Sequence, residues 1–243
     1  GASVLLLRAC LALLASPIYL LSFLGIWEPF CKKIFPFILE KISVFHDRKS
    51  KQHKQELFRN LPDFRGPSGE LRLLEIGTGS GSNFQFYPAG CRVTCSDINP
   101  SFQQSLAKNM KKNEHLHFER VLVAAGEDLG QVPSGSVDAV VCTLVLCSVR
   151  SVGRTLGEAL RGLRPGGAFY FLEHVAAERS SWRYFWQQIC NPTWKLIFAG
   201  CCLTRELWKD LEEAKFSELK IKHISLATPW MLIEPHIVGY GVK

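Results

Sequence analysis

A glycine-rich turn is the segment of this sequence with the clearest chemical meaning. It reads Glu75-Ile76-Gly77-Thr78-Gly79-Ser80-Gly81 and ends an apolar stretch that begins at Leu71. Glycines there permit a sharp turn and let backbone amides approach a ligand. Asp97 lies twenty residues after Gly77, where a carboxylate accepts hydrogen bonds from both ribose hydroxyls. This pair predicts a nucleotide-type ligand.

The same geometry would suit NAD, so the neighbouring residues are needed to distinguish NAD from other nucleotide-type ligands. The dinucleotide fingerprint requires Gly or Ala at position 82, and the residue is Ser82. A short-chain dehydrogenase would also have a Tyr-x3-Lys pair, and none is present: the residues four after Tyr87, Tyr170 and Tyr184 are Cys91, His174 and Gln188. NAD is therefore disfavoured, and a glycine turn without a ligand remains the structural alternative.

The elements that position these residues follow a turn-rich segment at 62–69. Strands are expected at 71–76, 92–96, 117–123, 137–143, 168–173, 219–224 and 237–242. Helices are expected at 101–112, 152–162, 182–189 and 205–215. Alternating strands and helices predict an α/β fold with a mostly parallel, doubly wound sheet, helices on both faces, and a ligand at the strand carboxyl ends.

The N-terminal region carries an uncharged stretch at 9–26, eighteen residues long, with Pro17 in its middle as a potential kink. This length is just adequate for a membrane span. A cleaved signal peptide is disfavoured because aromatic residues and lysines follow in place of a cleavage site and a polar mature sequence. A buried core helix is the other alternative. We expect an uncleaved anchor, either crossing the bilayer or lying in one leaflet, and a second amphipathic piece at 34–45 on the same membrane.

The charge is concentrated beside that stretch. The net charge is +7, and residues 31–65 hold nine basic against four acidic side chains. A basic excess after a membrane segment predicts that the rest of the chain faces the cytoplasm. We therefore expect a membrane anchor and interfacial segment at 1–45, a basic linker or helix at 46–69, and a catalytic domain at 70–243.

Nine cysteines are scattered along the chain without any CxxC pair. Their number is odd and their spacing matches neither a disulfide framework nor a zinc site. Reduced thiols in a cytosol-facing domain, and no metal, are expected.

Several further segments match the motifs of a known superfamily. Besides the glycine turn and Asp97, these are the segments 126–128 (GED), 136–141 (SVDAVV) and 163–167 (LRPGG). In this order and spacing, over about residues 70–175, they resemble class I methyltransferases. The resemblance implies a Rossmann-like seven-stranded sheet and S-adenosylmethionine as cofactor. It implies cofactor contacts from Glu75, Gly77, Thr78, Gly79, Gly81, Asp97, Ile98, Gly126, Glu127, Asp128 and Thr143.

A closer resemblance covers nearly the whole chain. Segments 84–88 (FQFYP), 141–149 (VCTLVLCSV), 173–175 (EHV) and 202–206 (CLTRE) are similar to the alkyl thiol methyltransferases of endoplasmic reticulum and lipid droplets, formerly called methyltransferase-like protein seven. It implies methyl transfer to the sulfur of a small lipophilic thiol, at the cytosolic face of either membrane. Small departures, such as Thr78 and Ile98, leave the glycines intact.

The reaction requires a thiolate placed in line with an electrophilic methyl group, with water excluded. His174, just beyond the fifth predicted strand, is the hypothesis for orienting or deprotonating the acceptor, and Thr143 is expected to line the cavity. The aromatic region 182–208 is either a helix face in the core or an apolar wall of the acceptor pocket.

Two rival functions remain. The first is methylation of RNA or of another small molecule, but the basic excess lies beside the anchor. The Asn/Asp-Pro-Pro-Tyr/Trp motif used for amino groups on bases is also replaced by Thr143-Leu144-Val145-Leu146. No nucleic-acid partner is therefore expected. The second is a non-enzymatic lipid-droplet protein, which leaves the cofactor motifs unexplained.

Overall fold

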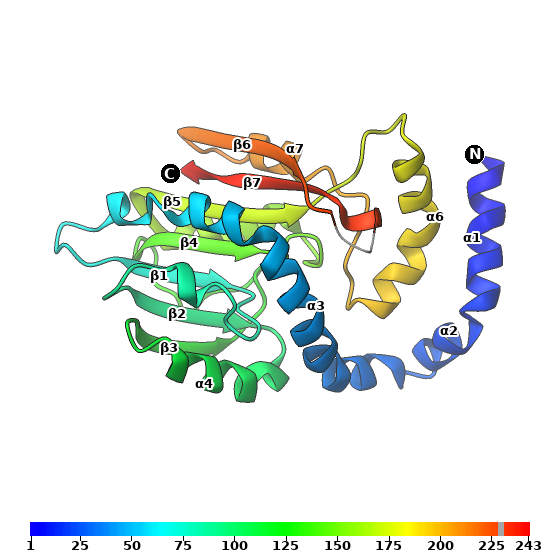
Figure 1. Ribbon diagram of the computed structural model, residues 1–243, viewed down its shortest axis with the longest axis horizontal. Helices are drawn as coiled ribbons and strands as arrows, with labels where there is room; N and C mark the ends of the chain where they lie inside the picture. Colours follow the sequence, from blue (N-terminus) through cyan, green and yellow to red (C-terminus); the bar gives the residue numbers. More distant parts are fainter. Residues whose placement is uncertain (228–230) are drawn as a thin grey trace.

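A seven-stranded mixed sheet forms the centre of the computed structural model, which describes residues 1–227 and 231–243 (Figure 1). The strands are β1 (Arg72–Ile76), β2 (Arg92–Asp97), β3 (His117–Val123), β4 (Val137–Thr143), β5 (Leu163–His174), β6 (Glu218–Ser225) and β7 (Pro235–Val242). Their order is β3-β2-β1-β4-β5-β7-β6. The first five pair in parallel, and β7 runs antiparallel between β5 and β6. The predicted mostly parallel sheet is confirmed.

Helices cover both faces of the sheet, as predicted. Alternate residues of β5 show the two faces: Phe169 and Phe171 pack in one buried cluster, and Tyr170 and Leu172 pack in the other. The first cluster includes side chains of α5 (Val152–Gly162) and α7 (Leu207–Glu213). The second includes side chains of α3 (Trp27–Phe58) and α4 (Gln103–Lys112). Each fully buried aromatic or leucine side chain stabilises the fold by about 1.5–3 kcal/mol.

The N-terminal apolar stretch forms two helices, α1 (Ala2–Leu14) and α2 (Ser16–Phe23), bent by 77°. Pro17 explains the break, because a proline in the first turn has no N–H to continue the helical hydrogen bonds. Within the described residues, no single helix is long and apolar enough to span a bilayer, although the bent pair together meets that test on length and composition.

The long helix α3 joins this region to the sheet. It runs from Trp27 to Phe58 with Pro36 inside it, so the boundary expected between residues 45 and 46 falls within one continuous helix. Its second half overlaps the segment 46–69, for which a basic linker or helix was expected. Lys54 is buried there, where its ammonium pairs with Asp47 at 2.7 Å.

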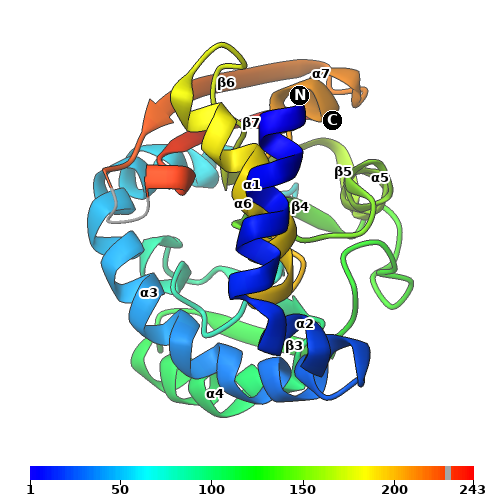
Figure 2. The same cartoon turned by 90° about the vertical axis from the view of Figure 1, so that its right-hand side faces the viewer.

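Helix α6 (Trp182–Ile197) extends eight residues beyond its expected end and lies beside α1 in both views (Figures 1 and 2). Three hydrogen bonds attach the N-terminal region to it. Arg8 Nε donates to the Gln188 carbonyl (2.8 Å), and Trp27 Nε1 donates to the Leu196 carbonyl (2.7 Å). The hydroxyls of Tyr19 and Thr193 lie 3.0 Å apart. The N-terminal helices are thus packed against the catalytic domain.

Candidate active site

The predicted site residues meet at one edge of the sheet, because β1, β2, β4 and β5 are parallel and end on the same side. The loop after β1 and Asp97 at the end of β2 lie on one side of the β1–β4 junction, and Thr143 and His174 end β4 and β5. The connections run in opposite directions from this junction. Such a switch point is where open α/β sheets bind their ligands.

The glycine loop adopts a backbone that side chains would obstruct. Gly77, Gly79 and Gly81 have φ angles of 66°, 56° and 83°. A Cβ on Gly77 would lie 2.2 Å from Cγ2 of Val145. A Cβ on Gly79 would meet only Phe102, at 3.9 Å, so this glycine borders open space. The loop therefore needs glycine both for its conformation and for close approach.

Asp97 is held facing this loop. Its Oδ2 accepts a hydrogen bond from the Gly79 amide (2.8 Å), and its Oδ1 accepts one from the Asn99 amide (2.9 Å). Burial raises the pKa of Asp97, and these backbone amides oppose that effect. Beside the carboxylate is a hollow lined by Thr78, Gly79, Ser96, Asp97, Asn99, Phe102, Val121 and Val123. A carboxylate with remaining lone pairs in a partly apolar hollow suits a ribose and its base.

Asn83 links two predicted site residues and was not itself among those predicted. Its Nδ2 donates to Glu75 Oε1 (2.8 Å) and to Thr143 Oγ1 (2.9 Å), which ties the ends of β1 and β4 together. Burial raises the pKa of Glu75 to about 7, although the hydrogen bond from Asn83 opposes the rise. Glu75 is buried and Thr143 is half-buried. Glu75 therefore stabilises the site from within the core.

The segment expected beside the adenine is only partly free to contact it. Glu127 Oε1 accepts hydrogen bonds from the amides of Arg150 and Ser151 (3.0 Å to Ser151), ahead of α5. Gly126 is buried, whereas Asp128 and Ile98 are exposed, Ile98 by 68%. The adenine contacts of Gly126, Glu127 and Asp128 and the cofactor contact of Ile98 stay predictions, with Glu127 already bound to the start of a helix.

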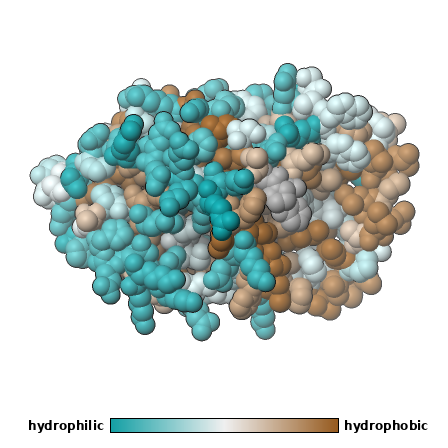
Figure 3. Space-filling model, in the orientation of Figure 1, coloured by the Kyte–Doolittle hydropathy of each residue, from teal (hydrophilic) through white to brown (hydrophobic). Residues whose placement is uncertain are grey.

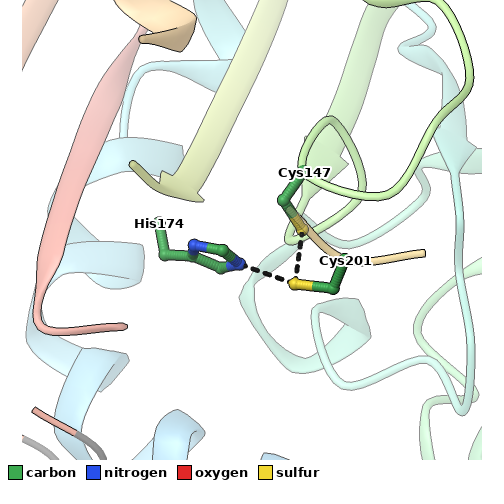
Figure 4. Close-up of side chains that lie close together, drawn as sticks. All are labelled: Cys147, His174 and Cys201. Carbon is green, nitrogen blue, oxygen red and sulfur yellow. Dashed lines mark hydrogen bonds between the residues drawn. The ribbon is translucent and has the colours of Figure 1, made fainter. Parts of the chain in front are cut away.

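His174 has two cysteine neighbours that sequence spacing did not reveal. Its Nε2 lies 3.0 Å from Cys201 Sγ, which lies 3.6 Å from Cys147 Sγ (Figure 4). Cys147 and His174 are buried and Cys201 is partly exposed. The three residues come from the loop after β4, the end of β5 and the loop after α6, so only tertiary folding brings them together.

The two sulfurs differ in acidity. The hydrogen bond between them is the main cause that raises the pKa of Cys147 and lowers that of Cys201. Burial also raises the pKa of Cys147, and it opposes the lowering at Cys201. Of the two thiols, Cys201 therefore loses its proton more readily, and the thiolate is the form of cysteine that reacts and binds metals.

Glu173 holds the loop after β4, which packs against the glycine turn and carries Cys147. Its Oε1 accepts hydrogen bonds from the amides of Val145 (3.0 Å) and Leu146 (3.1 Å). Burial raises the pKa of Glu173 to about 8. Leu144, just before this loop, has a φ of 55°, which is unusual for a residue with a side chain. The loop is therefore held in a strained conformation between the two halves of the site.

Comparison with known proteins agrees with this geometry. A family model described as a methyltransferase domain matches residues 74–171. The chain is 58% identical over 223 residues to thiol S-methyltransferase TMT1A of Homo sapiens, covering 92% of this chain and 91% of that protein. It is 50% identical to thiol S-methyltransferase TMT1B of Homo sapiens over 98% of each chain. The chain belongs to the thiol S-methyltransferase family. It is a class I methyltransferase with S-adenosylmethionine as its methyl donor.

Solved structures share the fold at low identity. The [4+2]-cyclase SpnF aligns with a TM-score of 0.58 and 16% identity, covering 78% of this chain and 79% of that one. Geranyl diphosphate methyltransferase, in complex with GPP and sinefungin, aligns with a TM-score of 0.57 and 16% identity over 76% of each chain. These likenesses support the fold alone, because one architecture carries different chemistries.

The residues present fit S-adenosylmethionine. The open side of Gly79 and the partly apolar lining of the small hollow lie next to a carboxylate that is already oriented. Gly77, Gly79 and Gly81 would pass along the methionine part, and Asp97 would hold the ribose. When bound, the cofactor supplies a methyl group on a positively charged sulfur.

Proposed function

We propose that this protein transfers the methyl group of S-adenosylmethionine to the sulfur of small lipophilic thiols, at the cytosolic face of the endoplasmic reticulum or of lipid droplets. A thiol is proposed as the methyl acceptor because the family relationship covers more than nine-tenths of the chain. The lipophilic character of the acceptor and the location at a membrane are inferred from the surface around the N-terminal helices.

That surface is strongly apolar. The large exposed hydrophobic residues between positions 5 and 45 include Leu13, Leu14, Phe23 and Phe37, each at least 69% exposed. They form the brown end of the molecule in Figure 3, where α1 and α2 lie. An apolar patch of this extent on one end is typical of a membrane-contacting face. The exposed Lys32 and Lys33 flank it and suit anionic headgroups.

The apolar end adjoins the acceptor side of the site. Helix α6 packs against α1 and leads directly into the loop that carries Cys201. Trp182 and Trp186 on α6 are also exposed. We infer that a lipophilic thiol enters from the membrane side, past α6, and reaches His174 and Cys201, while the cofactor occupies the opposite side near Asp97.

Methyl transfer to defined acceptors tests the proposal. Purified protein with labelled S-adenosylmethionine receives, in separate reactions, 2-mercaptoethanol, a longer alkyl thiol, the matching alcohol, an RNA and a protein extract. We expect label on both thiols, a lower KM for the longer one, and none on the alcohol. Label on RNA or protein but not on thiols would overturn the assignment, and label in no reaction would favour a non-enzymatic membrane role.

A further inference from the structure

We infer that Cys147, His174 and Cys201 form a binding site for a thiophilic divalent cation such as Zn²⁺, with one position left for the sulfur of the acceptor thiol. The inference rests on the proposed function for its fourth ligand, but the metal site itself does not. Two thiols and an imidazole are the ligand set of catalytic zinc sites that keep one position open.

The distances suit such an ion. The three donor atoms all lie within 4.8 Å of one another. Zinc bonds of about 2.3 Å to sulfur and about 2.0–2.1 Å to nitrogen place tetrahedral ligands roughly 3.6–3.8 Å apart. The two sulfurs are separated by 3.6 Å. His174 Nε2 lies 3.0 Å from Cys201 Sγ, and this contact has to open by about half an ångström when the ion binds.

Backbone hydrogen bonds hold the ligands in place. The Cys202 amide donates to the Cys147 carbonyl (2.8 Å), which fastens the loop after α6 to the loop after β4. Ala199 and Gly200 both have positive φ angles, 50° and 86°, and turn that loop just before Cys201. Such prior ordering lowers the entropy lost when the ion binds.

The imidazole of His236 does not provide a fourth ligand. His236 packs edge-on against His174, with ring centroids 6.4 Å apart. Its Nε2 lies 3.1 Å from His46 Nε2, and its Nδ1 is 2.9 Å from the Glu234 carbonyl. Both nitrogens are therefore engaged, and the described side chains supply three ligands.

This site would activate the acceptor directly. A thiol that coordinates the cation loses its proton to solvent and becomes a thiolate. The thiolate then forms a sulfur–carbon bond to the methyl group, the sulfonium sulfur–carbon bond breaks, and its electron pair stays on the departing sulfur. The products are a neutral thioether, S-adenosylhomocysteine and one proton. His174 acts here as a ligand, which replaces the base expected from the sequence.

Metal content tests the site without reference to activity. The full-length protein is loaded with Zn²⁺, desalted and analysed by mass spectrometry of its metals. We expect about one zinc per chain, and a loss of roughly tenfold or more in Cys147→Ser and Cys201→Ser. Cys202→Ser is the matched control, because this neighbouring cysteine contacts Thr204 at 3.6 Å and lies outside the cluster. S-adenosylhomocysteine binding checks that each variant is folded.

Co²⁺ substitution in the wild-type protein provides a second readout. We expect thiolate-to-cobalt charge-transfer and tetrahedral visible bands, which shift on addition of 2-mercaptoethanol. Absence of both zinc and these bands overturns the site, as does equal metal loss in Cys202→Ser. A Cys147–Cys201 disulfide in the isolated protein, without metal, would also overturn it and indicate a redox pair.

Different experimental results would refute the metal site and the proposed function. Undiminished thiol methylation by chelator-treated, metal-free protein would refute the metal site and leave the thiol methyltransferase function standing. Stoichiometric zinc in a protein that methylates none of the thiols tested would refute the proposed function and leave the metal site standing.

Discussion

The carboxylate of Asp97 is oriented by two backbone amides, those of Gly79 and Asn99, within the protein itself. A group fixed in this way loses little further freedom when a ligand binds. The same amides oppose the rise in the pKa of Asp97 that burial causes. Asp97 is therefore already oriented to accept hydrogen bonds from ribose hydroxyls.

Asp97→Ala should weaken S-adenosylmethionine binding by at least tenfold, because one hydrogen bond to a charged group contributes about 1.5–3 kcal/mol. Isothermal titration calorimetry measures the affinity. Asp63→Ala, which removes an exposed carboxylate away from the strand ends, should bind normally. Unchanged affinity in Asp97→Ala would remove this residue from the cofactor site.

Glu75 should make stability depend on pH. Its pKa is raised to about 7 in the folded protein by burial, against an ordinary value of 4.5. Between these values the folded state binds more protons than the unfolded state, so the free energy of unfolding falls as pH rises from about 4.5 to about 7. Urea unfolding at pH 5 and pH 8 measures this slope.

Glu75→Gln should flatten that slope and raise the free energy of unfolding at pH 8 by about 2–3 kcal/mol, since the amide keeps the Asn83 contact without a buried charge. Glu56→Gln, on the exposed surface of α3, is the control and should keep the wild-type slope. An identical slope in Glu75→Gln would show that this carboxylate is not the group responsible.

At the scale of elements, two strand-end loops are packed into each other. The turn after β1 accommodates Val145 from the loop after β4, and Glu173 at the end of β5 holds that second loop by two amides. Each loop is therefore shaped by the other. The cofactor side and the acceptor side of the site are joined through this contact.

Gly77→Ala should disturb this packing more than a change at an equally strained glycine. Both Gly77 and Gly90 have positive φ angles, 66° and 80°, but a Cβ on Gly90 would meet nothing within 4 Å. Gly77→Ala should be less stable than Gly90→Ala by about 1–3 kcal/mol, the usual cost of overpacking. Chemical denaturation compares the two, and equal losses would mean that Val145 moves aside freely.

At the scale of the whole molecule, the polar sheet domain and the apolar N-terminal end are connected by one helix, α3. It begins beside α2 and ends against the sheet, where Phe58 is buried and Lys54 pairs with Asp47. Any orientation imposed by a membrane on α1 and α2 is therefore transmitted to the catalytic domain. The proposed delivery of acceptors from a membrane would require such a rigid connection.

Vesicle flotation should detect this attachment. The triple variant Leu13→Asp, Leu14→Asp and Phe23→Asp should lose most binding to vesicles of phosphatidylcholine with anionic lipid, because it places three charges on the apolar face. Val121→Asp, on an exposed position of β3, is the control. Equal flotation of the triple variant would place the membrane contact elsewhere. Microscopy of the tagged protein in cells tests the endoplasmic reticulum and lipid-droplet assignment.

Local sequence was sufficient for the sheet and for the cofactor half of the site. Short strand-forming segments between turns specify strands such as β3 and β4 at their predicted bounds. The glycine turn follows one strand and Asp97 ends another, which places both at the same edge. Pro17 also located the break in the N-terminal helices, because its missing N–H acts within a single turn.

Only the tertiary structure decided the rest. Asn83 meets Thr143 across 60 residues and Cys147 meets Cys201 across 54, and no local spacing records such contacts. The extra length of α6 follows from its packing against α1 rather than from its own pattern. The sequence therefore determined what binds at the strand ends. The fold determined which thiols and imidazole meet beyond the ends of β4 and β5, because burial and long-range packing bring distant residues together.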